Sequence, residues 1–220
     1  MGRVARYDGY AKWYDRVNAE QAPHTTRLAA RLLGDGPGRL LDVGCGGGIH
    51  DQVFAERGWS VLGVDISDDQ LRLARDRGVE VVKADAHELP FGDGSFAAAV
   101  SIFTHTDVDD FPGVLREVVR ILAPGGGFVY VGAHPCFVGP HSEFVRAEGV
   151  PKLHPGYRTT GRYSEAPGIS PDGIRARMGA THLPLGPFLQ AFLEAGFTLE
   201  RLEEPGEREY PYILGLRCRR

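Results

Sequence analysis

A glycine-rich turn at residues 44–48 constrains the fold of this chain more than any other feature. It contains four glycines in five residues and follows a short apolar run at residues 39–43 that includes Asp42. Glycine allows positive φ angles, and without a Cβ atom its backbone can lie close to a ligand. Such a turn between a buried strand and a helix is typical of α/β proteins that bind a nucleotide or nucleoside.

The spacing of these glycines distinguishes two kinds of ligand. The dinucleotide pattern G-x-G-x-x-G is met at Gly44 and Gly46 but fails at Ile49. Asp42 also disfavours a pyrophosphate, because its carboxylate would repel the phosphates and attract a cationic group. The turn therefore favours a positively charged nucleoside over the dinucleotide of a nicotinamide oxidoreductase.

Short apolar runs alternate with amphipathic stretches along most of the chain, which indicates strand–helix–strand units. The pattern predicts strands at residues 39–43, 60–64, 79–83, 96–103, 127–133, 197–203 and 212–217. It predicts helices at residues 49–57, between Ser67 and Gly78, and at residues 111–122 and 187–195. Because crossover helices join parallel strands, we expect an α/β fold with a doubly wound, mostly parallel seven-stranded sheet.

Between residues 134 and 184 this alternation stops, because prolines and glycines recur too often for long regular elements. The segment contains Phe137, Phe144, Tyr157 and Tyr163, large apolar groups that a flexible linker lacks. We therefore expect a single domain over residues 1–220, in which residues 134–184 are inserted after the fifth strand as a substrate cover.

Three of the predicted strands end at or near an aspartate: Asp42, Asp65 and Asp85. Asp65 follows Asp42 by about 20 residues, where an α/β nucleoside site places the carboxylate that accepts the ribose hydroxyls. A single aspartate there is often only a helix cap or a turn former. Three of them at the ligand-binding edge, beside the glycine turn, favour a nucleoside site.

Charge and apolar pattern exclude several classes of protein. The 25 basic and 29 acidic residues give a net charge of −4, too small to drive binding to nucleic acid or to a membrane surface. No apolar run approaches the length of a membrane span, and residues 1–15 lack the apolar stretch of a signal peptide. We therefore expect a cytoplasmic protein whose partner is a small molecule.

Metal binding is not expected. The three cysteines form no C-x-x-C pair, which argues for reduced thiols. Four histidines lie between residues 134 and 182, but their spacing matches no compact ligand motif.

The chain resembles the class I S-adenosylmethionine-dependent methyltransferases, especially the small-molecule branch that includes the ubiquinone and menaquinone biosynthesis enzymes. Residues 41–48 are similar to the cofactor loop of that family, residues 64–67 to its ribose-binding motif and residues 84–86 to its adenine-contacting motif. Residues 7–15 resemble the aromatic lead-in, within residues 1–30, that closes over the cofactor. The resemblance covers residues 7–133 and 184–217.

This resemblance implies a Rossmann-like fold, S-adenosyl-L-methionine as cofactor, and a role for nine residues. The methionine part of the cofactor is expected near Asp42, Gly44, Cys45 and Gly46. Asp65 is expected to bind the ribose, Ile66 to lie against the adenine, and Asp85 and Ala86 to lie near the adenine amino group. Tyr14 belongs to the aromatic lead-in. Ile66 is equally consistent with a purely packing role.

Two features depart from the family. Ala97 stands where many relatives have an acidic residue, and residues 134–184 match no motif. The resemblance therefore specifies the cofactor better than the methyl acceptor.

Methyl transfer from a sulfonium is an in-line displacement that needs alignment and exclusion of water rather than a nucleophilic side chain. We therefore expect transfer to an oxygen or nitrogen of a small metabolite. A hydroxyl acceptor would need a base, and His105 and His134 follow the fourth and fifth predicted strands. Both histidines are equally consistent with a structural role. The alternative function is a regulatory protein that binds the cofactor without transferring its methyl group.

Overall fold

The structure is a computed structural model that describes residues 5–144 and 149–220. The central strands are β1 (Gly38–Val43), β2 (Trp59–Asp65), β3 (Val81–Lys83), β4 (Phe96–Ile102), β5 (Leu122–Ala133), β10 (Thr198–Glu203) and β11 (Ile213–Arg219). The helices beside them are α1 (Ala11–Asn18), α2 (Ala22–Leu33), α3 (Asp51–Glu56), α4 (Asp68–Asp76), α5 (Phe111–Ile121) and α7 (Leu185–Ala195).

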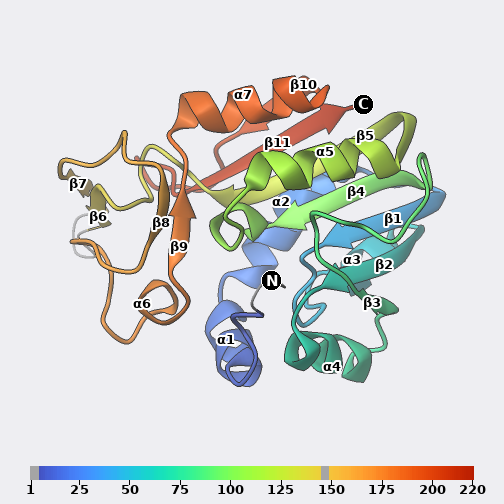
Figure 1. Ribbon diagram of the computed structural model, residues 1–220, viewed down its shortest axis with the longest axis horizontal. Helices are drawn as coiled ribbons and strands as arrows, with labels where there is room; N and C mark the ends of the chain where they lie inside the picture. Colours follow the sequence, from blue (N-terminus) through green and yellow to red (C-terminus); the bar gives the residue numbers. More distant parts are fainter. Residues whose placement is uncertain (1–4, 145–148) are drawn as a thin grey trace.

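These strands form one seven-stranded sheet in the order β10-β11-β5-β4-β1-β2-β3 (Figure 1). The pairs among β1 to β5 are parallel, and β11 is antiparallel to both of its neighbours. The prediction of a doubly wound, mostly parallel seven-stranded sheet is therefore confirmed.

The chain changes direction across the sheet between β1 and β4. From β1 it continues through β2 to β3 on one side, and β4 and β5 lie on the other. In doubly wound sheets the ligand crevice opens at the carboxyl ends of the strands beside such a switch point. The turn that follows Val43 lies there.

Alternating side chains of the inner strands pack on opposite faces of the sheet. Leu40 and Val100 pack against Leu28 and Leu32 of α2 in one apolar core. Leu41, Phe128 and Tyr130 belong to a second core, which also contains the apolar sides of α5 and α7. The sheet is therefore covered on both faces, as the near-continuous apolar runs of its strands require.

Within the inserted segment, the described residues 134–144 and 149–184 form only short elements: β6 (Ser142–Phe144), β7 (Pro151–Leu153), β8 (Gly161–Tyr163), α6 (Ile174–Met178) and β9 (Ala180–His182). The strands form two small antiparallel pairs, β6 with β7 and β8 with β9. Figure 1 shows this inserted segment and α1 at the end of the sheet toward which β4 runs. The inserted segment thus lies at the end of the sheet where the sequence predicts that the ligand binds.

The N-terminal region differs from the sequence analysis, which assigned it no helix. Two helices, α1 and α2, occupy most of residues 11–33. Of the helices in the described ranges, none has the length and apolar character needed to cross a bilayer.

Candidate cofactor site

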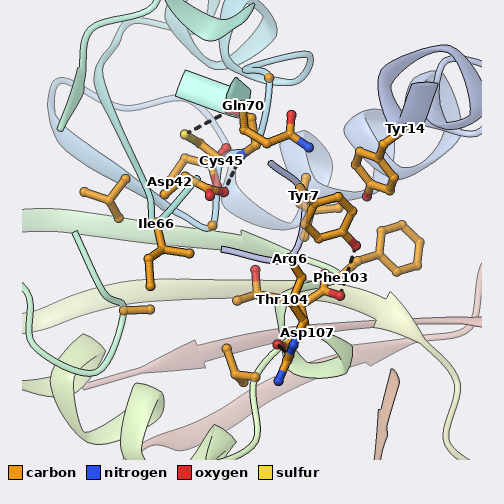
Figure 2. Close-up of a pocket in the computed structure, with 18 of the residues that line it drawn as sticks. Arg6, Tyr7, Tyr14, Asp42, Cys45, Ile66, Gln70, Phe103, Thr104 and Asp107 are labelled. Carbon is orange, nitrogen blue, oxygen red and sulfur yellow. Dashed lines mark hydrogen bonds between the residues drawn. The ribbon is translucent and has the colours of Figure 1, made fainter. Parts of the chain in front are cut away.

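A cavity of about 610 Å³ opens at the carboxyl ends of β1, β2 and β4. Its walls come from the turn after β1, the segments that follow β2, β3 and β4, and the N-terminal segment (Figure 2). All nine residues predicted to bind the cofactor line this cavity: Tyr14, Asp42, Gly44, Cys45, Gly46, Asp65, Ile66, Asp85 and Ala86. The structure therefore brings together residues from four separate parts of the sequence.

The turn after β1 requires glycine at position 44. Gly44 has a φ of 76°, and a Cβ atom there would lie 2.5 Å from the Thr104 side-chain oxygen. Thr104 is held in place, because its hydroxyl donates a 2.9 Å hydrogen bond to the Val43 carbonyl oxygen. The backbone at this point can thus lie close both to the end of β4 and to a bound molecule.

Asp65 lies at the end of β2 and connects the turn to α4. Its Oδ2 accepts a hydrogen bond from the Gly46 N–H at 3.0 Å, and its Oδ1 accepts one from the Ser67 N–H at 2.9 Å. Burial raises the pKa of Asp65, whereas these backbone N–H groups lower it. Its predicted contact with the ribose stays a prediction.

Asp42 is 1% exposed and faces a second buried carboxyl, Asp51 of α3. Desolvation raises the pKa of Asp42 well above its ordinary range and that of Asp51 to about 6. Neither Asp51 oxygen has a hydrogen-bond partner among the described residues. A proton shared between the Asp42 and Asp51 carboxyl groups gives each of them a hydrogen-bond partner and leaves only one negative charge on the pair.

The third predicted acid, Asp85, lies in the loop after β3. Its Oδ1 is 2.8 Å from Nδ1 of His87, and the His87 Nε2 is 2.8 Å from the Asp110 carbonyl oxygen. His87 therefore links the wall of the cavity formed by the segment after β3 to the start of α5. The role of Asp85 and Ala86 toward the adenine stays a prediction.

The N-terminal segment closes one side of the cavity. The rings of Tyr7 and Tyr14 are 4.6 Å apart, and both line the cavity. The Gly9 N–H donates to Asp69 of α4 at 2.6 Å, and Arg77 forms a 2.7 Å ion pair with Asp15. This segment is thus bound to the rim of the site, as the resemblance to an aromatic lead-in implied.

The loop after β4 contributes residues that the sequence analysis did not identify. Phe103 has a φ of 64°, a rare conformation for a bulky residue and one that is enriched at functional sites. The Tyr7 hydroxyl donates a 3.0 Å hydrogen bond to Oδ1 of Asp107 (Figure 2). Burial is the main reason that the pKa of Asp107 is raised to about 6.

The two histidines predicted as bases do not line this cavity. His105 is 5% exposed, its Nδ1 contacts the Tyr130 hydroxyl, and its ring lies 5.3 Å from that of Phe188. Desolvation lowers the pKa of His105 to about 3. His134 is 3% exposed, and its Nε2 is 2.7 Å from the Glu204 carboxylate. A catalytic role for either residue stays a prediction.

Comparison with protein families supports the cofactor interpretation. A family described as "Methyltransferase domain" matches residues 41–130. This match begins in β1 and ends in β5, and it includes the glycine turn and the three aspartates at the strand ends.

Curated relatives are methyltransferases with different acceptors. The demethylmenaquinone methyltransferase of Tropheryma whipplei is 34% identical over 158 residues, which are 67% of this chain and 66% of the relative. The fatty-acid O-methyltransferase of Mycolicibacterium smegmatis is 34% identical over 134 residues, which are 58% of this chain and 48% of the relative. The chain thus spans just under two thirds of the first relative and about half of the second.

Solved structures resemble the whole described fold. The crystal structure of an S-adenosylmethionine-dependent methyltransferase from Mesorhizobium loti has a TM-score of 0.74 and 27% sequence identity, and the alignment covers 97% of this chain and 99% of that one. The likeness therefore extends to both ends of the sheet.

Proposed function

We propose, from the premise that the chain belongs to the class I S-adenosylmethionine-dependent methyltransferases, that it transfers a methyl group to an oxygen or nitrogen of a small metabolite. S-adenosylmethionine is the cofactor of this family. The observation that carries the proposal is the gathering of all nine predicted cofactor residues around one cavity. These residues come from four separate segments of the sequence, and each segment contributes at least one of them to the cavity wall.

The residues of the cavity fit this cofactor. The carboxylates of Asp65 and Asp85 give it a negative character, which suits a sulfonium and an ammonium group. The buried Oε1 of Gln70, which lines the same cavity, has no hydrogen-bond partner among the described residues. An amino or hydroxyl group of a bound molecule would satisfy that acceptor.

The proposed binding mode follows the strand ends. The turn at Gly44 and Gly46 would hold the methionine part with Asp42, Asp65 would accept the ribose hydroxyls, and the segment after β3 would surround the adenine. The cofactor supplies a methyl group that is bound to a positively charged sulfur. When the methyl group is transferred, this sulfur becomes the neutral sulfur of a thioether. The chain would contribute alignment of the acceptor and exclusion of water, and the proposal gives the tyrosines of the N-terminal segment a part in both.

The acceptor is proposed to be a small molecule that enters beneath the inserted segment. The names of the relatives support this class, since one acts on demethylmenaquinone and another on a fatty acid. Residues 134–184 lie at the same end of the sheet as the cofactor cavity (Figure 1), which is where a substrate cover is needed.

Two measurements test the proposal. Calorimetry should show saturable binding of S-adenosylmethionine and of S-adenosylhomocysteine. Incubation with panels of phenols, alcohols, amines and carboxylic acids should then release S-adenosylhomocysteine with at least one of them. Binding without release from any panel would instead support a cofactor-binding regulatory protein.

A further inference from the structure

A second cavity, of about 330 Å³, adjoins the cofactor cavity. The two have five lining residues in common: Tyr7, Tyr14, Asn18, Phe103 and Asp107. The outer wall of the second cavity comes from residues 168–180 of the inserted segment, including Ile169, Ile174 and Arg175. A molecule bound there would therefore be next to one bound in the cofactor cavity.

Of the five shared side chains, Asp107 is the one that can take up a proton near neutral pH. Phe103 and Asn18 do not titrate. Burial raises the pKa of both Tyr7 and Tyr14 further above neutrality, so their hydroxyls stay protonated.

We propose that Asp107 is the general base of the methyl transfer and accepts the proton of a hydroxyl acceptor that binds in the second cavity. This inference rests on the proposed function. The acceptor oxygen forms its bond to the methyl carbon as the bond from that carbon to sulfur breaks. The O–H proton moves to the Asp107 carboxylate, and the electron pair of the broken bond stays on sulfur, which becomes neutral.

One hydrogen bond reaches the Asp107 carboxyl group, and further contacts hold its backbone and the neighbouring Asp109. The Tyr7 hydroxyl donates to Oδ1, and Arg6 donates to the Asp107 backbone carbonyl. Arg6 also donates to both carboxylate oxygens of Asp109 at 3.0 Å, and Arg162 lies 3.6 Å from that carboxylate. These contacts connect the N-terminal segment, the loop after β4 and the insertion through Asp107 and the exposed Asp109.

The protonation state of Asp107 suits this role. With a pKa of about 6, its carboxyl is about nine tenths ionised at neutral pH and can still hold a proton transiently. Burial and Asp65 raise this pKa, whereas the Tyr7 hydrogen bond, Arg6 and Arg162 lower it. The titratable and charged groups that interact with the Asp107 carboxyl from the surrounding elements are Arg6, Tyr7, Tyr14, Asp65, Tyr130 and Arg162.

The same carboxylate restricts the class of acceptor. A carboxylic acid is already ionised at neutral pH, so it has no proton for Asp107 to accept. A protonated amine has no electron pair free to attack the methyl carbon, and Arg175, which also lines the second cavity, disfavours its positive charge. A neutral hydroxyl keeps its proton at neutral pH and needs a base to lose it, and Arg175 favours the negative charge that develops on the acceptor oxygen as the proton leaves.

The decisive variants are Asp107→Asn and Tyr7→Phe, with Asp35→Asn as the matched control. Asp35 carries an exposed carboxylate that pairs with Arg57, and it lines neither cavity. Asp107→Asn should lower kcat for hydroxyl acceptors about 100-fold or more, the range of general-base catalysis. Its Kd for S-adenosylhomocysteine should stay within about threefold of the wild-type value, which is too small a change to reflect lost binding contacts.

Tyr7→Phe tests whether Asp107 is the base through the pH dependence of the reaction rate. Without the hydroxyl donor the pKa of Asp107 rises, so the acidic limb of the pH–rate profile should move to higher pH. A base located elsewhere would leave this limb in place.

A binding measurement on 4-nitrophenol, without turnover, gives an independent readout. With S-adenosylhomocysteine present, the absorbance of the bound probe reports its own pKa. The nearby Asp107 carboxylate should raise that pKa, and Asp107→Asn should lower it relative to wild type, whereas Asp35→Asn should not.

The outcomes separate this inference from the proposed function. Wild-type protein that releases no S-adenosylhomocysteine from any acceptor would count against methyl transfer, and the probe would then decide whether Asp107 faces the second cavity. Full activity of Asp107→Asn, a bound-probe pKa that is the same in wild type and Asp107→Asn, or no binding of 4-nitrophenol would each overturn the assignment of Asp107.

Discussion

The Oδ2 atom of Asp65 accepts a 3.0 Å hydrogen bond from the backbone N–H of Gly46, so the acid at the end of β2 holds the glycine turn that follows β1. Asp65→Ala would leave this N–H unpaired and would also remove the proposed acceptor for the ribose. We expect cofactor affinity to fall by about 1–3 kcal/mol, the cost of leaving such donors unpaired, measured by calorimetry with S-adenosylhomocysteine.

Asp68→Ala is the control for this change. Asp68 lies in α4 only three residues further along, but it is exposed and pairs with Lys83. It should leave the affinity unchanged, because exposed ion pairs contribute little. Equal losses in the two variants would show that the effect is one of general charge rather than of the site.

Gly44→Ala should weaken cofactor binding and destabilise the fold. The new methyl group would meet the Thr104 hydroxyl, and the backbone would hold an alanine at a φ of 76°. Gly125→Ala is a close control, since Gly125 has a φ of 75° but nothing within 4 Å of an added Cβ. Backbone strain of about 1–2 kcal/mol is common to both variants. Denaturant unfolding should show a larger loss for Gly44→Ala, and matching losses would contradict the steric argument.

The Asp42–Asp51 pair should make the unliganded protein less stable as pH rises. Its folded-state pKa values lie above those of the unfolded chain, so the stability it contributes is complete below about pH 4 and is lost as pH rises through about 6. Asp51→Asn removes one of the two buried charges. Relative to wild type, this variant should gain up to about 3 kcal/mol between about pH 4 and pH 7.5, measured by urea unfolding. A difference that does not change with pH would argue against a shared proton.

Much of the sheet was predictable because its signals are local. Each of the seven strands of the central sheet overlaps a predicted strand, since buried parallel strands are short apolar runs bounded by turns. Helices α1 and α2 were missed for a physical reason. Their first residues follow Tyr10 and Gln21, neither of which caps its helix with a side-chain hydrogen bond, so the capping signal is absent and only Pro23 marks the start of α2.

The site was predictable only where its residues follow strands in recognisable motifs. Asp42, Asp65 and Asp85 could be found in this way. The contact between Tyr7 and Asp107 joins residues 100 positions apart, and no local pattern encodes it. The orientation of His105 could not be predicted from the sequence either, because the positive φ of Phe103 and the 3₁₀ turn at Thr104–Thr106 redirect the chain just after β4.

His105 provides the last test, because its sequence-based role and its structural setting predict different results. Its pKa of about 3 keeps the ring neutral at physiological pH, and its partner is the buried Tyr130 hydroxyl. If this contact is structural, His105→Phe should destabilise the protein by about 1–3 kcal/mol, because the Tyr130 hydroxyl loses its partner.

A double-mutant cycle with Tyr130→Phe isolates the contact. In the structural case the two losses of stability should be less than additive, and cofactor affinity and the shape of the pH–rate profile should stay as in wild type. If His105 is instead the base, kcat should fall about 100-fold or more, beyond any loss of stability, and the shape of the pH–rate profile should change. That second pattern would restore the sequence-based hypothesis and remove the need for Asp107, since a single proton leaves the acceptor in each transfer.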